Sequence, residues 1–207
     1  MLIKTIPVGH LDTNCYIVTD EKTLKTAIID PGADSNTILD YVESNGLTTE
    51  AIFLTHGHFD HIMALEAVME ATGAPAYINK RDAESGRKGR QSGLTAYFQD
   101  GVLQWYKTGD RINVGSLVFH IIETPGHSPG SVILQCENVL FTGDTLFRDS
   151  CGRTDLEGGD IDILKQSLKM ITKLDGDYEV YPGHSESSTL ERERRFNKYM
   201  LLAVDRQ

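Results

Sequence analysis

The feature that most constrains this chain is a dense run of metal-ligand side chains directly behind an apolar segment. The segment AIFL, residues 51–54, continues into THGHFDH, whose ligand-type residues are His56, His58, Asp60 and His61. The first two histidines are two residues apart, so on an extended loop their side chains can point to the same side. The aspartate and the third histidine open the next segment and approach from another direction. Zinc takes imidazole nitrogens and carboxylate oxygens, so the run predicts a metal site at a strand end.

Three further ligand-type residues occupy similar places later in the chain. His127 follows TPG, Asp144 follows FTG and His184 follows YPG, so each stands behind a glycine at the end of an apolar segment. A small residue at a strand end lets the backbone bend, so that these side chains can reach a shared site. Each of the three, taken alone, is more typical of an ordinary turn. His10 and His120 have no clustered partner and are interpreted as structural or surface residues, although His10 lies beside a candidate active-site turn.

The order of apolar and turn-forming segments predicts the fold class. Both halves of the chain run strands first and helices after, which predicts an α+β fold with four layers, an αββα sandwich. The expected strands are 1–8, 14–19 and 25–30, which are antiparallel, then 51–54, 77–79, 117–123, 131–136, 139–142 and 178–181. The expected helices are 34–45, 61–72, 161–174 and 190–203.

The length of 207 residues predicts a single domain over 1–207, since domains average roughly 150 residues. The segment 80–107 has no sustained periodicity and is predicted to be a long surface connection or lid. Its basic residues are either solvated or bind an anionic thiol; they are Arg81, Arg87, Lys88 and Arg90.

The charge and the hydropathy pattern exclude several classes of protein. The formal net charge of -10 repels phosphate backbones and disfavours a nucleic-acid partner. No apolar run approaches the ~18 residues that would span a bilayer, and the first residues lack a signal peptide, so we expect a cytoplasmic protein with no membrane partner. Cys15, Cys136 and Cys151 form no CxxC pair, which indicates reduced thiols.

The ligand pattern HxHxDH, followed by separate His, Asp and His, resembles that of the metallo-β-lactamase-fold hydrolases. Among the subfamilies, the chain is most similar to short single-domain hydroxyacylglutathione hydrolases (glyoxalase II). The matching segments are DTNCY at 12–16, GDTLF at 143–147, CGRTD at 151–155, and PGH at 182–184 followed by Glu191 and Arg192. The resemblance implies the metallo-β-lactamase fold for 1–207.

The resemblance also implies how two divalent ions, zinc with iron or manganese as alternatives, would divide the ligands. One ion would take His56, His58 and His127; the other would take Asp60, His61 and His184; Asp144 would bridge them. Two such ions lower the pKa of a shared water and polarise a carbonyl, which leads to hydrolysis of an acyl bond by a metal-bound hydroxide. Asp60 and Asp144 would neutralise part of the metal charge and orient the nucleophile. A small acyl thioester suits such a site, because a thiolate with a pKa of about 8.5 leaves without a strong general acid.

Substrate recognition is less constrained by the sequence. By the resemblance Arg153 would contact a substrate carboxylate; the alternative is a surface salt bridge with Asp155 or Glu157. Only 23 residues follow His184, whereas full-length glyoxalase II has a helical C-terminal domain that helps bind glutathione, so the thiol carrier stays open. The oligomeric state is also left open.

Other proteins with this fold have different activities. Metallo-β-lactamases commonly carry Cys or Ser in place of Asp144, which disfavours β-lactam hydrolysis, and Cys151 lies seven residues too late to be that ligand. The main alternative is a persulfide dioxygenase with one iron on His56, His127 and Asp144, whose open positions would take oxygen and substrate. A non-enzymatic metal-binding scaffold is disfavoured because every ligand type is present, and a nuclease is disfavoured by the negative charge.

Overall fold

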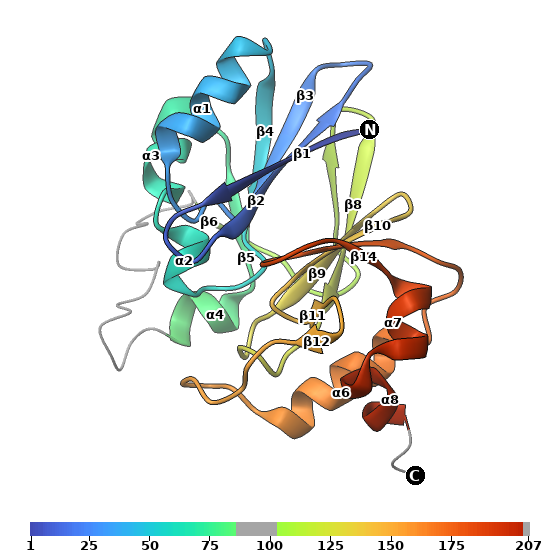
Figure 1. Cartoon of the computed structure of the whole chain (residues 1–207). Coiled ribbons are helices and arrows are strands. Elements are labelled where there is room, and N and C mark those ends of the chain that lie inside the picture. The colour runs from blue at the N-terminus through green and yellow to red at the C-terminus, as the bar shows by residue number, and fades with distance from the viewer. Residues whose placement is uncertain (86–102, 205–207) are drawn as a thin grey trace.

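Two six-stranded sheets face each other at the centre of the described part of the chain, residues 1–85 and 103–204 of the computed structural model (Figure 1). The first sheet has the order β1-β2-β3-β4-β5-β6 and the second has the order β14-β13-β10-β9-β8-β7. The strands of the first sheet are β1 Leu2–Val8, β2 Thr13–Asp20, β3 Lys25–Ile29, β4 Thr48–Phe53, β5 Ala76–Ile78 and β6 Leu103–Trp105. Those of the second are β7 Arg111–Val114, β8 Leu117–Glu123, β9 Val132–Cys136, β10 Val139–Gly143, β13 Glu179–Pro182 and β14 Ser188–Thr189.

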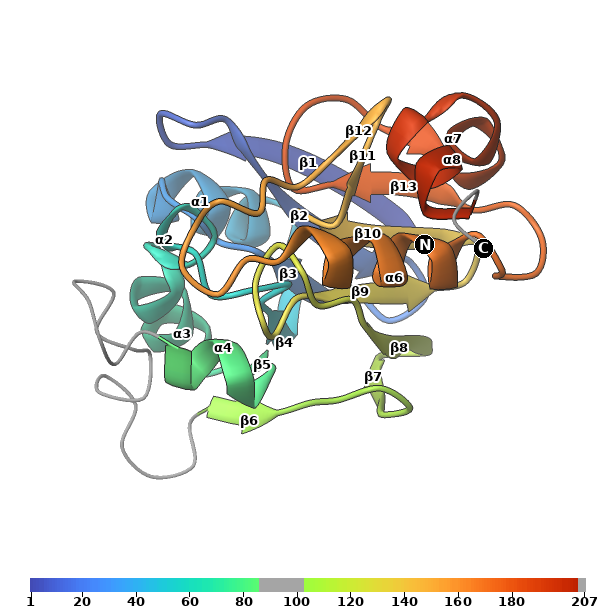
Figure 2. The ribbon, with the colours of Figure 1, turned by 90° about the horizontal axis from the view of Figure 1, so that it is seen from below.

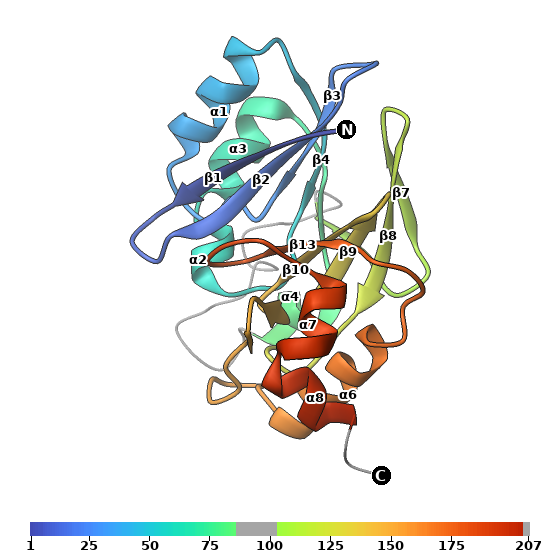
Figure 3. The same cartoon turned by 45° about the vertical axis from the view of Figure 1, so that its right-hand side comes forward.

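Helices cover the outer face of each sheet, which gives the expected four-layer αββα sandwich (Figure 3). The helices on the side of the first sheet are α1 Ser35–Ser44, α2 Phe59–Ile62, α3 Leu65–Thr72 and α4 Lys80–Ser85. Those on the side of the second are α6 Ile161–Ile171, α7 Leu190–Phe196 and α8 Lys198–Val204. Figure 2 shows α6 lying across β9 and β10, and a small hairpin of β11 Leu146–Phe147 and β12 Ser150–Cys151 lies above them.

Three apolar layers, one between each pair of neighbouring layers, hold this part of the chain together. Successive side chains of a strand point to opposite faces of its sheet. In β2, Ile17 therefore packs under α1 and α3, whereas Tyr16 and Val18 pack between the two sheets. Because both faces are covered, every residue of β2 is buried, the polar residues at its two ends as well as the apolar residues 15–18.

Two helices that the periodicity predicts as continuous are broken in the structure. The expected helix 61–72 is α2 and α3, because the Ala64 N–H donates to the Pro31 carbonyl, 3.0 Å away, instead of continuing one helical ladder. The expected helix 190–203 is α7 and α8. Asn197 separates them with an extended backbone, and its side-chain amide donates to the carbonyls of Phe147 and Ser150. Both breaks come from contacts distant in sequence.

The prediction of an irregular connection over 80–107 is wrong at its two ends, which form α4 and β6. β6 pairs with β5 as a parallel edge strand, and this pairing stabilises a strand of only three residues. The middle of the segment, 86–102, lies outside the described residues, and with it Arg87, Lys88 and Arg90, so the lid stays a prediction. In the described ranges, no helix combines the length and the apolar character needed to cross a membrane.

Substitution of Phe119 tests the apolar layer between the sheets. The Phe119 side chain is fully buried, and its ring centroid lies 4.9 Å from that of Phe53. Phe119→Ala should lower the free energy of unfolding by about 3–5 kcal/mol, because the cavity is enclosed by both sheets. Phe196→Ala, at a side chain that is 66% exposed, should lower it by less than about 1 kcal/mol. Urea denaturation measures both, and equal losses would contradict the assigned core.

Candidate metal centre

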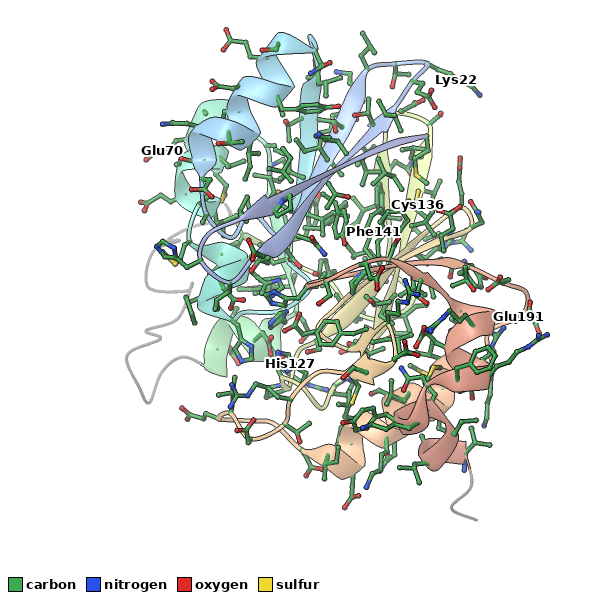
Figure 4. All side chains as sticks on the ribbon, viewed as in Figure 1. Lys22, Glu70, His127, Cys136, Phe141 and Glu191 are labelled. Carbon is green, nitrogen blue, oxygen red and sulfur yellow. The ribbon has the colours of Figure 1, made fainter. Side chains whose placement is uncertain are left out.

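The ligand-type side chains predicted from the sequence meet at one end of the sandwich, where strands of both sheets end. Figure 4 shows His127 far from Lys22, which marks the other end of the first sheet. The loop after β4 carries two of these residues, α2 carries two, and one each follows β8, β10 and β13. They are His56, His58, Asp60, His61, His127, Asp144 and His184, and their ligand atoms fall into three overlapping groups, within each of which all atoms lie within 4.8 Å of one another.

The first group consists of three imidazoles whose nitrogens face one another. His58 Nδ1 lies 3.1 Å from His56 Nε2 and 2.9 Å from His127 Nε2. Two ligands of a tetrahedral zinc ion, each bound at 2.0–2.1 Å, would lie roughly 3.3 Å apart. The spacing of the three nitrogens is therefore close to the one that a single ion requires.

The second group consists of one carboxylate and two imidazoles. Asp60 Oδ2 lies 3.5 Å from His61 Nε2 and 3.2 Å from His184 Nε2. The Asp144 carboxylate lies between these two groups and forms the third group with His56 and His61. Its Oδ1 is 3.5 Å from His61 Nε2, and its Oδ2 is 3.4 Å from His127 Nε2. One carboxylate therefore faces ligand atoms of both groups.

Two buried polar atoms test whether this site suits a cation. In the described part of the chain three buried side-chain polar atoms lack a hydrogen-bond partner, and two of them, His61 Nε2 and Asp144 Oδ1, lie in this cluster. Leaving a buried polar atom unpaired is costly, and such atoms in native structures commonly face an ion. A divalent cation between this nitrogen and this oxygen would satisfy both atoms. The nitrogen and oxygen donors of the whole cluster also fit such an ion.

The far ring nitrogens of the histidines have partners of their own, which fix the ring orientations. The His127 Nδ1–H donates to the Arg153 carbonyl at 2.7 Å, and the His184 Nδ1–H donates to the Leu11 carbonyl at 3.0 Å. A carbonyl can only accept, so each Nε2 is left with its lone pair toward the site. His61 Nδ1 instead lies 2.9 Å from the Asp30 carboxylate.

The charges around the cluster act differently on its side chains. At His61 and His184 the neighbouring carboxylates outweigh burial and raise the pKa, so an ion bound there would displace a proton. Burial, together with neighbouring histidines, lowers the pKa of His56 and brings that of His58 to about 4, so both are neutral at pH 7. Burial alone would raise the pKa of Asp60, but the neighbouring His184 and His61 hold it below its usual value. Burial likewise opposes ionisation of Asp144, and the charge of His61 outweighs it.

Asp30 supports the site and was missed by the sequence analysis. Its carboxylate lies 2.9 Å from His61 Nδ1 and accepts hydrogen bonds from the Thr55 N–H at 2.7 Å and the Thr55 hydroxyl at 2.6 Å. It therefore orients a ligand-type histidine and the first residue of the ligand loop. A signal was present, because Asp30 directly follows an apolar strand and precedes Pro31-Gly32.

Asp82, in α4, links two ligand-bearing loops and was also missed. Its carboxylate accepts from the Gly57 N–H at 2.8 Å, from the Ser128 hydroxyl at 2.6 Å and from the Gly130 N–H. Gly57 separates the first two histidines of the cluster, and Ser128 follows His127. Asp82 stands in the segment that lacked periodicity, so no pattern in the sequence singled it out.

The segment DTNCY, which the family resemblance matched without a role, holds the loop that carries His184. The Asn14 side-chain amide donates to the Pro182 carbonyl at 3.0 Å, and the Asn14 backbone N–H donates to the Gly183 carbonyl at 2.7 Å. A Cβ on Gly183 would lie 2.2 Å from Asp144 Oδ1, so only glycine permits this approach of the loop to Asp144.

Three other residues quoted from the resemblance have contacts that are structural. Arg153 is exposed and forms two hydrogen bonds of 2.6 Å to Asp155, which is the salt bridge named as the alternative; its contact with a substrate stays a prediction. Cys151 lies outside the ligand groups among the described residues, and burial raises its pKa to about 11. Arg192 pairs with Asp149 and with the buried Glu193.

The comparisons with known proteins agree with this geometry. Residues 8–184 match the family model described as the metallo-beta-lactamase superfamily. The chain is 35% identical to the probable metallo-hydrolase YqgX of Bacillus subtilis, over 95% of this chain and 96% of that protein. It is 30% identical to the hydroxyacylglutathione hydrolase GloC of Haemophilus influenzae, over 97% and 98%. The chain belongs to the metallo-beta-lactamase superfamily of metal-dependent hydrolases, and its fold is the one expected.

Solved structures with the same fold carry different names. BLEG-1 B3 metallo-beta-lactamase aligns with a TM-score of 0.85 and 34% identity, over 96% of this chain and 99% of that one. TTHA1623 in a di-iron-bound form aligns with a TM-score of 0.81 and 32% identity, over 95% and 99%. ETHE1 from Myxococcus xanthus aligns with a TM-score of 0.80 and 28% identity, over 99% and 91%. Fold likeness alone therefore leaves the reaction open.

Asp82→Asn tests the link between the two ligand loops. The amide keeps the size of the side chain but removes acceptor capacity toward Gly57 and Ser128, so the ligand loops should lose their alignment. We expect a fall of about 10-fold or more in zinc affinity, the range typical of groups that orient metal ligands. Competition with a chromophoric chelator measures it. Asp175→Asn, at an exposed aspartate beyond α6, is the control, and equal affinities of the two variants would contradict this role.

Proposed function

We propose that this protein is a binuclear metal-dependent hydrolase that cleaves a small acyl thioester. The observation that carries the proposal is the place of the Asp144 carboxylate, which faces His61 of one ligand group and His127 of the other at 3.5 and 3.4 Å. A bridging carboxylate needs this arrangement, and a single ion would leave several of the ligand-type side chains without a role. The GloC relative, named a hydroxyacylglutathione hydrolase, supports the thioester.

The position of each ligand-type residue determines which ion it would bind. His56, His58 and His127 would hold one ion, Asp60, His61 and His184 the other, and Asp144 both. A pair of divalent ions, for which we propose zinc, supplies an activated water and polarises the acyl carbonyl. The two aspartates offset part of the metal charge. The Thr13 hydroxyl donates to Asp60 Oδ2 at 3.2 Å and keeps that carboxylate in place.

Hydrolysis of a thioester needs no general acid from the remaining residues. A thiolate, with a pKa of about 8.5, leaves without protonation, whereas an amine leaving group needs a general acid. The titratable side chains gathered at the centre in the described part of the chain are the ligand-type residues and their partners, and these are already engaged. A small-molecule thioester is therefore the substrate class that we expect.

A mononuclear iron oxygenase is the second candidate. The likeness to ETHE1 favours it, and His56, His127 and Asp144 are the residues that would hold the iron. The two mechanisms differ in their need for oxygen, because zinc has no redox chemistry.

The oxygen requirement separates these candidates. Zinc-loaded protein should hydrolyse S-lactoylglutathione or another acyl thioester equally well with and without oxygen, releasing one thiol per acid, because water is the second reactant. A thiol-reactive dye and an oxygen electrode measure the two quantities. Loss of activity without oxygen, or consumption of oxygen with a persulfide and no thioester cleavage, would contradict the proposal. A β-lactam assayed in parallel tests the activity in the name of BLEG-1.

Asp144→Asn tests the bridging role. The amide is neutral and donates where the carboxylate accepts, so both ions should bind more weakly and kcat should fall about 100-fold or more. Steady-state kinetics at saturating zinc and metal analysis after gel filtration measure the two effects. Asp175→Asn should match the wild type in both. An Asp144→Asn protein with full metal content and full kcat would show that the Asp144 carboxylate does not bridge two ions.

A further inference from the structure

A cleft lies beside the candidate metal centre. It has a volume of about 450 Å³, within the range of small-molecule pockets. The turn between β1 and β2 forms one side and α2 with the residue after it forms the other, and Figure 1 shows these two segments next to each other. Its apolar wall consists of Val8, Leu11, Ala33, Phe59 and Met63.

The cleft adjoins the metal centre at Asp60. Thr13 and Asp60 line it, and Asp60 Oδ2 is the atom that lies 3.2 Å from His184 Nε2. A molecule whose reacting carbonyl lies at the two ligand groups would therefore reach the cleft past the Asp60 side chain.

Three large apolar side chains around the cleft are exposed to solvent. Leu11 is 54% exposed, Phe59 50% and Met63 67%. Single exposed apolar residues are common, but several around one concave surface mark a binding site. Phe59 is the first residue of α2 and Met63 directly follows it, so the helix that carries Asp60 and His61 also presents this apolar surface.

The charges around the cleft favour an uncharged occupant. In the described part of the chain, its ionisable lining residues are His10, Asp34 and Asp60, with no lysine or arginine among them. The Asp34 carboxylate accepts from the Gly9 N–H at 2.8 Å, at the rim. Common carrier thiols such as glutathione and coenzyme A are anionic at pH 7, and the Asp34 carboxylate in the wall repels them. An uncharged apolar chain meets no such penalty.

We propose that this cleft binds the acyl chain of the thioester and makes the enzyme selective for apolar, uncharged acyl groups. This inference rests on the proposed thioesterase function, because the acyl group is defined by the bond that the metal centre cleaves. The carrier thiol then lies on the other side of the reacting carbonyl, away from Asp34.

A chain-length series tests the proposal. With one fixed thiol and acyl groups from acetyl to octanoyl, kcat/KM of the wild type should rise about fourfold per methylene until the cleft is filled, the factor that corresponds to about 0.8 kcal/mol per buried CH₂. Met63→Glu places a charge in the apolar wall and should flatten this rise, and so should Leu11→Gln, at an exposed turn. Met170→Glu is the matched control, since Met170 is 40% exposed on α6 and outside the cleft, and it should keep the rise. A flat series for the wild type, or an equal rise in all variants, would overturn the proposal.

A binding measurement separates this inference from the proposed function. The probes are 2-oxoalkyl thioethers of increasing chain length, in which a methylene between sulfur and carbonyl leaves no thioester to cleave. Calorimetry with zinc-loaded protein should show Kd falling with chain length in the wild type and in Met170→Glu but not in Met63→Glu. This pattern without thioester hydrolysis would support the cleft and refute the thioesterase. Hydrolysis without any chain-length dependence of Kd or kcat/KM would support the thioesterase and overturn the cleft proposal.

Discussion

Imidazoles and carboxylates in this protein are held so close together that their lone pairs face one another, and the surrounding structure is organised around that contact. His58 Nδ1 lies 2.9 Å from His127 Nε2, and the buried Asp144 Oδ1 and His61 Nε2 face each other unpaired. Such an arrangement removes polar groups from water without pairing all of them, which is unfavourable in the protein alone. A cation that accepts those lone pairs turns the same arrangement into a binding site.

The two sheets make this contact possible because their strands end at the same edge of the sandwich. The loops beyond those ends are short and are fixed by groups outside the cluster, among them Asp30, Asp82 and Asn14. Glycines allow the close approaches: Gly126 has a φ of 134°, and a Cβ there would lie 2.3 Å from the backbone of Leu164 in α6. The apolar layers between sheets and helices therefore set the positions of the ligand-type side chains.

Much of this was predictable from the sequence, and the exceptions have physical reasons. The strands after which the ligand-type residues stand are apolar runs, so their existence and order follow from local pattern. The seven side chains are brought together as the resemblance implied, and their role as ligands remains a proposal. Local sequence pattern did not predict the features that depend on contacts between residues distant in sequence. Asn197 ends a helix because its side-chain amide donates to the carbonyls of Phe147 and Ser150. Asp82 supports the site because its carboxylate accepts a hydrogen bond from Gly57, which is distant in sequence. Three-residue β6 is stabilised by pairing with β5.

Metal content per chain is the most direct test of a centre with two ion sites. Protein loaded with zinc and freed of excess metal by gel filtration should contain two zinc ions per chain. Elemental mass spectrometry measures this content. His184→Ala removes a ligand-type residue of the second group alone, so it should lower that content toward one ion. A wild-type content of one ion that His184→Ala leaves unchanged would contradict the binuclear centre.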